Sequence, residues 1–346
     1  MTPPSVLRGR RPGIVDVARL AQVSPSTASR AIRGGAVSPD RRDRVLRAAA
    51  QLAYVPLQAA VRLSSGRTRT VGVVVPTAER WFFVEVVTAA ARVLRAAGYD
   101  LLIFDGGHGE PGWLPEAGEL RSKVDAVVLV ASAASDDGML ALRDLAVPAV
   151  VVGGPRDVPG RVGVDDESGA ATAVRHLVLL GHRRIAMIAG GTGAGFDRTS
   201  SSARRAGFRG ALEAAGIPAG SAAIVSRPWG VAGGAAAMEE ILGGDRLPTA
   251  VFAESDEMAF GALQVLRRAG LEVPRDISVI GFDNHEMAAV FDLTTVAQPV
   301  ADQGRAAAVL LLELLGQGGP LHPGAGVTLP TSLIVRGSVC PPKGEL

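Results

Sequence analysis

The sequence predicts an α/β protein in which a small all-α headpiece precedes a large core of two doubly wound parallel-sheet lobes. The first 70 residues contain short helical patterns and no run typical of a strand. From Val71 onward, continuous apolar runs typical of buried strands alternate with helical patterns. About eight such strand–helix units exceed what a single sheet holds, so we expect two lobes of similar topology.

Residues 14–33 predict a helix-turn-helix, in which two short helices flank a tight turn at Gln22 and Val23. The first helix is expected to bury Val17, Leu20 and Ala21. Ser24 is a good N-cap and Pro25 suits the first helical position, because its missing N–H has no helical partner there. Ser38 and Pro39 repeat this pattern for a third helix that runs to about Ala53. Its expected inward residues are Val45, Leu46, Ala49 and Leu52.

The outer face of the second predicted helix carries short hydroxyls and guanidinium groups, namely Ser26, Thr27, Ser29, Arg30 and Arg33. Arginine binds guanine through two hydrogen bonds in the major groove, and serine or threonine binds bases or phosphates. The face is therefore a candidate for contact with duplex DNA. The alternative is an ordinary helical hairpin with a solvated polar face, because helix-turn-helix patterns are short and degenerate.

Charge is distributed unevenly along the chain. Residues 1–70 contain 13 Arg, no Lys and 3 acidic residues, a net charge of +10, whereas the remainder carries a net charge of −8. A basic module beside an acidic body is the distribution expected of a protein that binds a polyphosphate. The alternative is a disordered basic tail, but Leu46, Leu52 and Tyr54 continue an apolar helical period, which favours a folded headpiece.

The core is expected to alternate strands and helices. Apolar runs predict strands at 71–75, 101–104, 126–130, 149–152, 185–188, 223–225, 250–253 and 277–281. Periodic segments predict helices at 84–97, 170–180, 202–215, 233–242 and 257–269. Four glycines that commonly stop helices follow them: Gly98, Gly181, Gly216 and Gly270. Ligands of such sheets bind at the carboxyl ends of the strands, in a cleft between the lobes.

Several chemistries are disfavoured by composition. The single Cys340 excludes intrachain disulfides, and the five histidines have no pair at metal-ligand spacing, so neither metal nor cofactor is expected. No apolar run reaches the roughly 18 residues of a membrane span, and no secretory signal opens the chain, so we expect a cytoplasmic protein. The glycine-rich stretch 190–195 lacks nucleotide-binding spacings, which favours a flexible loop over a phosphate cradle. The pairs Asp165-Asp166 and Glu239-Glu240 are interpreted as solvated.

Polar groups near strand ends suggest a ligand site. Asp256 and Asp283 follow predicted strands, and Arg204 lies near the start of the helix after the glycine-rich loop. Carboxylates and guanidinium groups bind hydroxyls, and the aromatic residues Phe82, Phe83 and Trp229 offer faces for a sugar ring. The alternative is that Asp256 caps a helix and Asp283 caps a turn.

These residues lie within strings that resemble the lactose-repressor (LacI/GalR) family of bacterial transcriptional regulators over residues 13–340. The headpiece strings are DVARLAQVSPSTASRAI and YVPLQAAVRLSSGRTRTVGVVVP, and the core strings are WFFVEVV, HLVLLGHRRIAMIAG, RRAGF, SDEMAFGAL, DISVIGFDN and LTTVAQP. The resemblance implies a headpiece, a hinge helix and a two-lobed core like that of periplasmic binding proteins. It also implies a homodimer or a pair of dimers.

The resemblance implies roles for individual residues. For DNA it implies base contacts by Pro25, Ser26 and Arg30, beside Ser24, with Thr27 and Ser29 on phosphate or bracing the helix. It further implies that Leu63 wedges into the minor groove beside the small Ala60. For the effector it implies Phe83, Arg204, Trp229, Asp283 and Gln298, next to Phe82, Ser255 and Asp256.

Some positions depart from the family pattern. Gln22 stands where the family prefers a turn glycine, and Arg33 stands where an asparagine ends the recognition helix, which adds a candidate DNA contact. Near the expected cleft, Ser255 replaces an asparagine and Gly153 replaces an acidic residue. These two departures leave the identity of the ligand open.

We expect a tail at 1–12, a headpiece at 13–56, a hinge at 57–70, a core at 71–340 and a tail at 341–346. The first lobe is expected at about 71–164 and 299–325, and the second at about 165–296 and 326–340.

The expected function is a dimeric regulator, most simply a repressor, that binds a palindromic operator under control of a small molecule such as a sugar. Two alternatives are a solute sensor without operator specificity and a sugar-metabolising enzyme. The enzyme alternative is weakened because no nucleotide-binding motif is present.

Overall fold

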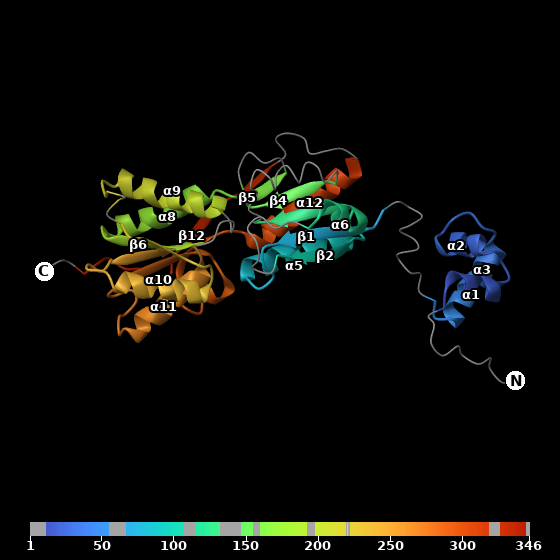
Figure 1. Ribbon diagram of the computed structural model, residues 1–346, viewed down its shortest axis with the longest axis horizontal. Helices are drawn as coiled ribbons and strands as arrows, with labels where there is room; N and C mark the ends of the chain where they lie inside the picture. The colour runs from blue at the N-terminus through green and yellow to red at the C-terminus, as the bar shows by residue number, and fades with distance from the viewer. Residues whose placement is uncertain are drawn as a thin grey trace. The chain divides into compact units, whose positions relative to one another are not determined.

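The computed structural model describes residues 12–54, 67–106, 115–131, 147–154, 160–191, 198–218, 220, 222–317 and 326–343. The chain divides into two compact units, Met1–Thr68 and Arg69–Leu346 (Figure 1). The predicted N-terminal tail (except residue 12), the hinge helix with Ala60 and Leu63, and most of the glycine-rich stretch lie outside the described residues. Among the helices that the structure describes, none combines the length and apolar character needed to cross a membrane.

The first unit contains a three-helix headpiece, formed by α1 (Ile14–Ala21), α2 (Pro25–Ile32) and α3 (Pro39–Gln51). Its core is made of small residues: Val17, Ala18, Ala21, Ala28, Ala31, Val45 and Ala48. The prediction that Leu20 and Leu46 face inward is wrong, because they are 48% and 49% exposed. Short helices that meet through alanines bury only a narrow stripe, and both leucines lie beside it.

The second unit consists of two lobes, each built on a six-stranded sheet. The first-lobe sheet has the order β11-β5-β4-β3-β1-β2. Its strands are β1 (Thr70–Val75), β2 (Asp100–Asp105), β3 (Ala126–Val130), β4 (Ala149–Val152), β5 (Arg161–Val164) and β11 (Val327–Leu329). The described helices of this lobe are α5 (Trp81–Ala96), α6 (Ala117–Lys123) and α12 (Val300–Gln317). Every strand pair in this sheet is parallel.

The second-lobe sheet repeats this arrangement in the order β12-β10-β9-β8-β6-β7. Its strands are β6 (Ile185–Gly190), β7 (Ile224–Arg227), β8 (Ala250–Ala253), β9 (Ser278–Asp283), β10 (Thr294–Ala297) and β12 (Ser332–Ile334), of which only β12 is antiparallel to its neighbour. Its helices are α8 (Asp166–Leu179), α9 (Arg198–Ala214), α10 (Val231–Leu242), α11 (Asp256–Arg268) and the short η2 (Glu286–Ala288). In Figure 1, α8 and α9 cover one face of this sheet, and α10 and α11 cover the other.

The pleat of β1 shows how the first-lobe sheet is buried on both faces. Val71, Val73 and Val75 pack into the cluster that contains residues of α5 and α12, whereas Val74 packs with Leu120 of α6 on the opposite face. Successive side chains of a strand point to opposite faces, so a strand covered on both sides is apolar throughout. This explains why the apolar runs predicted the central strands.

The predicted fold class is confirmed: an N-terminal helical region precedes two parallel-sheet α/β lobes. The four glycines predicted to stop helices all have positive φ. The strands β5, β10, β11 and β12 and the helices α6 and α12 were not predicted. The missed strands have three or four residues each and all contain a polar residue, so none of them forms a continuous apolar run. In α12, the run VLLLELL is apolar nearly all round, which weakens the helical period.

One predicted lobe boundary is wrong. Residues 326–340 were assigned to the second lobe, but β11 pairs with β5 in the first-lobe sheet. The chain passes from the first lobe to the second between Val164 and Asp166 and returns between Ala297 and Val300. It passes to the second lobe again between Leu329 and Ser332, after β11. A three-residue edge strand carries no sequence feature that distinguishes which of two sheets it joins.

Candidate functional site

The headpiece presents the start of α2 as its candidate nucleic-acid interface. The Ser24 hydroxyl accepts a hydrogen bond from the Thr27 backbone N–H at 3.2 Å and lies 2.9 Å from the hydroxyls of both Ser26 and Thr27. The predicted N-cap and the predicted start of the helix at Pro25 are therefore confirmed. Ser24, Pro25 and Ser26 are exposed, so their polar atoms face solvent at the positive end of the helix dipole.

Arginine side chains flank this hydroxyl cluster. Arg33 folds back along α2, where its guanidinium donates to the Ser29 hydroxyl at 2.7 Å. Arg30 is exposed, and within residues 12–54 its guanidinium has no hydrogen-bond or ion-pair partner. An exposed guanidinium without a partner retains all five donors for an external acceptor. Of the two arginines, Arg30 is therefore the better placed for contact with a base.

The turn before α2 is strained. Gln22 ends α1 in the left-handed conformation, with φ 52° and ψ 49°. This conformation is unfavourable by roughly 1–2 kcal/mol for a residue with a Cβ, whereas glycine adopts it without that penalty. The turn between α1 and α2 therefore contains backbone strain, because Gln22 and not glycine occupies the left-handed position.

We predict that Gln22→Gly raises the free energy of unfolding of the headpiece by about 1 kcal/mol, because the strain is removed. Hydrogen exchange of the α1 amides in the full-length chain measures this change. Gln51→Gly, on the exposed face of α3, is the matched control and should destabilise by about 1 kcal/mol. Equal destabilisation by both substitutions would contradict the prediction.

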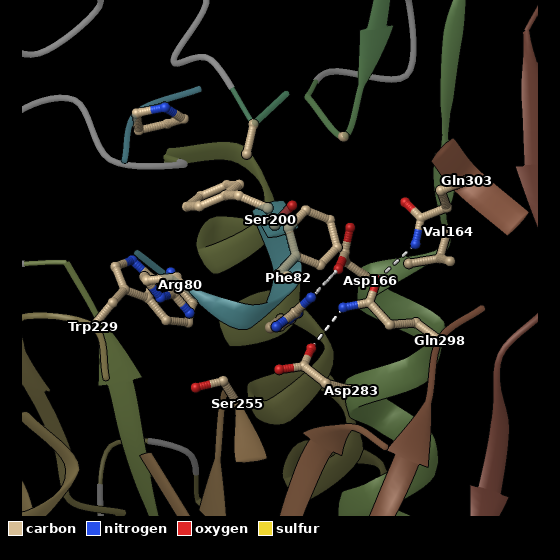
Figure 2. A pocket seen from close by; sticks show the side chains of 15 residues that line it. Arg80, Phe82, Val164, Asp166, Ser200, Trp229, Ser255, Asp283, Gln298 and Gln303 are labelled. Carbon is tan, nitrogen blue, oxygen red and sulfur yellow. Dashed lines mark hydrogen bonds and ion pairs between the residues drawn. The ribbon is translucent and has the colours of Figure 1, made fainter. Parts of the chain in front are cut away.

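The core contains a pocket of about 610 Å³, part of it open to solvent, between the two lobes of the second unit (Figure 2). Its residues lie mostly where strands end: Pro76, Ala131, Gly153 and Val164 in the first lobe, and Trp229, Ser255, Asp283 and Gln298 in the second. The helix residues Arg80, Phe82, Phe83, Asp166, Ser200, Arg204 and Gln303 complete the lining, with Arg80 as the N-cap of α5. The predicted cleft at the carboxyl ends of the strands is thus present.

Seven of the eight predicted effector residues line this pocket: Phe82, Phe83, Arg204, Trp229, Ser255, Asp283 and Gln298. Asp256 does not, and it is fully buried. Its carboxylate accepts hydrogen bonds from the Thr295 hydroxyl at 2.6 Å and the His285 backbone N–H at 2.8 Å. Burial, and next the nearby Asp283 carboxylate, raises the pKa of Asp256 well above its usual range. Asp256 therefore holds the chain after β9 in place from outside the pocket lining.

Arg204 and Asp166 form a buried ion pair in the pocket wall. The Arg204 Nε and Nη2 atoms each lie 2.9 Å from Asp166 Oδ1, and Nη1 donates to the backbone carbonyl of Glu254. The guanidinium also lies over the Phe282 ring, 3.8 Å from its centroid. The interpretation of Asp166 as solvated is wrong, because only 7% of it is exposed. Its position at the start of α8, directly after β5, would have pointed to the site, but the sequence did not predict that strand.

Asp283 is held by a relay of two amides. Gln303 donates to Gln298 at 3.0 Å, and Gln298 donates to Asp283 Oδ1 at 2.6 Å, so one oxygen of the carboxylate is occupied (Figure 2). The backbone of Asp283 has φ 127°, a conformation that residues other than glycine rarely adopt. Such strained backbone is typical of functional sites. Burial raises the pKa of Asp283 to about 6, although Arg204 and the Gln298 hydrogen bond oppose the shift.

Ser255 and Glu254 complete the second-lobe side. The Ser255 hydroxyl caps α11 by accepting a hydrogen bond from the Met258 N–H at 3.3 Å. This bond occupies part of its capacity to accept a hydrogen bond from a ligand. Glu254 is fully buried behind the pocket and accepts from the Gly190 N–H at 2.8 Å and the Ser201 hydroxyl at 2.9 Å. Burial raises the pKa of Glu254 to about 7. Within the part of the chain that the structure describes, no group of three or more potential ligands is placed to hold a metal ion.

A basic helix-turn-helix headpiece, carried on the same chain as a two-lobed core with a pocket, defines a DNA-binding regulator. Residues 13–57 match the family model of bacterial regulatory proteins of the lacI family, and residues 174–339 match a periplasmic binding protein-like domain. The HTH-type transcriptional regulator CelR of Thermobifida fusca is 37% identical over 350 residues, covering 96% of this chain and 99% of the relative. The chain belongs to the lacI family.

Other relatives are also transcriptional regulators. The HTH-type transcriptional repressor CytR of Escherichia coli K12 is 34% identical over 331 residues, covering 93% of this chain and 95% of the relative. Among solved structures, a CelR–cellobiose complex has a TM-score of 0.68 at 33% identity and covers 95% of this chain and 100% of that one. The lac repressor dimer bound to operator and the anti-inducer ONPF has a TM-score of 0.81 at 26% identity, covering 96% and 100%. These relatives are regulators, so the expectation of a DNA-binding transcriptional regulator, not an enzyme, is confirmed.

Proposed function

We propose that this protein is a repressor that binds a palindromic operator as a dimer, and that a sugar in the interlobe pocket controls its affinity for DNA. The observation that carries the proposal is the pairing, in one pocket, of a carboxylate (Asp283), a guanidinium (Arg204) and an aromatic ring (Trp229). Hydroxyls bind to the first two groups, and the C–H face of a sugar ring packs against the third. The relatives named as a repressor and as a cellobiose complex support both halves of the proposal.

The DNA half assigns base contacts to Pro25, Ser26 and Arg30, and phosphate or helix-bracing contacts to Ser24, Thr27, Ser29 and Arg33. Two headpieces joined through a dimer would read two half-sites related by the same two-fold axis. Leu63 and Ala60, which lie outside the described residues, would contact the minor groove at the operator centre. Such a protein works in the cytoplasm, where the chromosome lies.

Control by the ligand requires coupling between the two sites. A sugar that binds one arrangement of the lobes more tightly shifts the dimer toward that arrangement, and so changes how well the two headpieces match the operator. Such coupling is typically about 1–3 kcal/mol and is reciprocal, so the operator must change sugar affinity by the same factor.

The test begins with selection of duplexes from a random pool by the full-length protein. The proposal expects enrichment of an inverted repeat, and expects at least one sugar of a neutral panel, cellobiose included, to change the gel-shift midpoint. Enrichment without any effect of sugars would leave a DNA regulator with a different effector. Sugar binding without any sequence preference would favour the alternative of a solute sensor without operator specificity.

Sugar affinity is expected to fall with acidification below about pH 6. A ligand hydroxyl donates to the ionised Asp283 carboxylate, whose pKa is raised to about 6, so protonation below that value replaces a charged acceptor with a weaker neutral one. One ionisation linked to binding lowers affinity by up to about tenfold for each pH unit below the pKa. Titration calorimetry across this range measures the change, and Asp283→Asn is the control, with weaker but flatter binding. An identical profile in both proteins would contradict the role of Asp283.

A further inference from the structure

The Trp229 indole packs against Gly190 and lies under the Arg80 guanidinium. One face rests against Gly190, where an added Cβ would lie 2.1–2.5 Å from three carbons of the indole ring. The Arg80 guanidinium covers the ring as well, with its central carbon 4.7 Å from the ring centroid (Figure 2). A sugar cannot reach the face against Gly190, because backbone lies there. On the face over which the Arg80 guanidinium lies, a sugar ring stacks only if Arg80 moves.

Arg80 is held in this position from both lobes. It is the N-cap residue of α5 in the first lobe, and its Nε lies 3.1 Å from Oε2 of Glu257, on α11 of the second lobe. The two side chains are 19% and 18% exposed, so this ion pair is largely shielded from solvent. The neighbouring Trp81 ring makes a second contact between the lobes, 4.7 Å from the His285 ring.

We propose that Arg80 is a specificity-determining residue that occupies the ligand face of Trp229 and must move aside before a sugar ring stacks there. The proposal rests on the proposed function, because it takes the ligand to be a ring with an apolar C–H face. It adds that ligand entry breaks the Arg80–Glu257 ion pair. The pocket thereby links occupancy directly to a contact that joins the two lobes.

Two consequences for ligand choice follow. A cationic ligand meets Arg80 as a like charge, which disfavours its approach to the ring. A neutral ring gains the indole face but loses a cation–π contact and part of an ion pair, so Arg80 lowers its affinity. The cation–π contact corresponds to about threefold to thirtyfold in affinity. Only a ligand that replaces these contacts well, by stacking and by hydroxyl bonds to Asp283 and Arg204, displaces Arg80.

The first test needs no ligand. Trp81→Phe and Trp113→Phe leave Trp229 as the only tryptophan of the three in the chain. In that background we expect Arg80→Ala to raise the acrylamide quenching constant of Trp229 by about twofold or more, because one face becomes accessible. Glu257→Gln should give a smaller rise by loosening Arg80. Arg92→Ala, an exposed arginine on the same helix and outside the pocket, is the matched control and should change nothing. Unchanged quenching in Arg80→Ala would overturn the proposal.

The second test uses cellobiose as the probe in titration calorimetry with the full-length chain. Arg80→Ala is expected to bind about threefold to thirtyfold more tightly than the wild type. Equal or weaker binding would overturn the proposal, since Arg80 would then hold the sugar directly. If neither protein binds cellobiose, that result counts against the proposed sugar effector, and the quenching measurement alone decides the role of Arg80.

Discussion

Replacing Arg204 with leucine is expected to destabilise the core by about 3–5 kcal/mol, because the Asp166 carboxylate would stay buried without its partner. Arg204 and Asp166 are only 6% and 7% exposed, so water does not replace the lost contacts. The backbone carbonyl of Glu254 would also lose its charged donor. The same substitution is expected to remove sugar binding, since the pocket loses its buried guanidinium.

Urea unfolding of the full-length protein measures this effect, with the transition of the core followed by circular dichroism. Arg305→Leu is the control, because Arg305 and Asp302 pair on the surface of α12 and are 49% and 55% exposed. That substitution should cost no more than about 1 kcal/mol. The double substitution Arg204→Leu and Asp166→Leu should recover part of the stability, because no unpaired charge remains. A double variant as unstable as the sum of the two single variants would show that the pair is not the cause.

Replacing Arg30 with alanine is expected to weaken binding to the operator by about 1–3 kcal/mol, with little change in affinity for random DNA. Its guanidinium is exposed and has no partner within residues 12–54, so no protein contact is lost with it. A bidentate contact with guanine contributes only on the correct sequence, whereas a phosphate contact contributes on every duplex.

Fluorescence anisotropy with the selected operator and a scrambled duplex, at matched salt, separates these cases. Arg41→Ala is the control for the loss of one positive charge, because Arg41 is exposed on α3 and outside the proposed contact face. It should change both affinities alike. An equal loss on both duplexes in Arg30→Ala would place Arg30 on phosphate and refute its role in base recognition.

Local features of the sequence predicted local structure well. Ser24 and Pro25 start α2 because a hydroxyl acceptor and a proline meet the needs of the first helical turn whatever surrounds it. Gly98, Gly181, Gly216 and Gly270 stop helices because glycine tolerates positive φ. The central strands are continuous apolar runs, because a sheet covered by helices on both faces has no polar side. Short edge strands such as β11 lack any such pattern, and the prediction missed them.

The amino-acid sequence by itself determined the helical headpiece, the two parallel-sheet lobes and seven of the fifteen residues that line the pocket. Each of these depends on neighbours along the chain, or on the fact that parallel strands end at one edge of a sheet. The tertiary structure alone decided that Asp166 pairs with Arg204, that Asp256 accepts a hydrogen bond from Thr295, and that Arg80 covers Trp229. These pairs join residues far apart in the chain, so burial and distance in the folded core select their partners, and no local pattern contains that information.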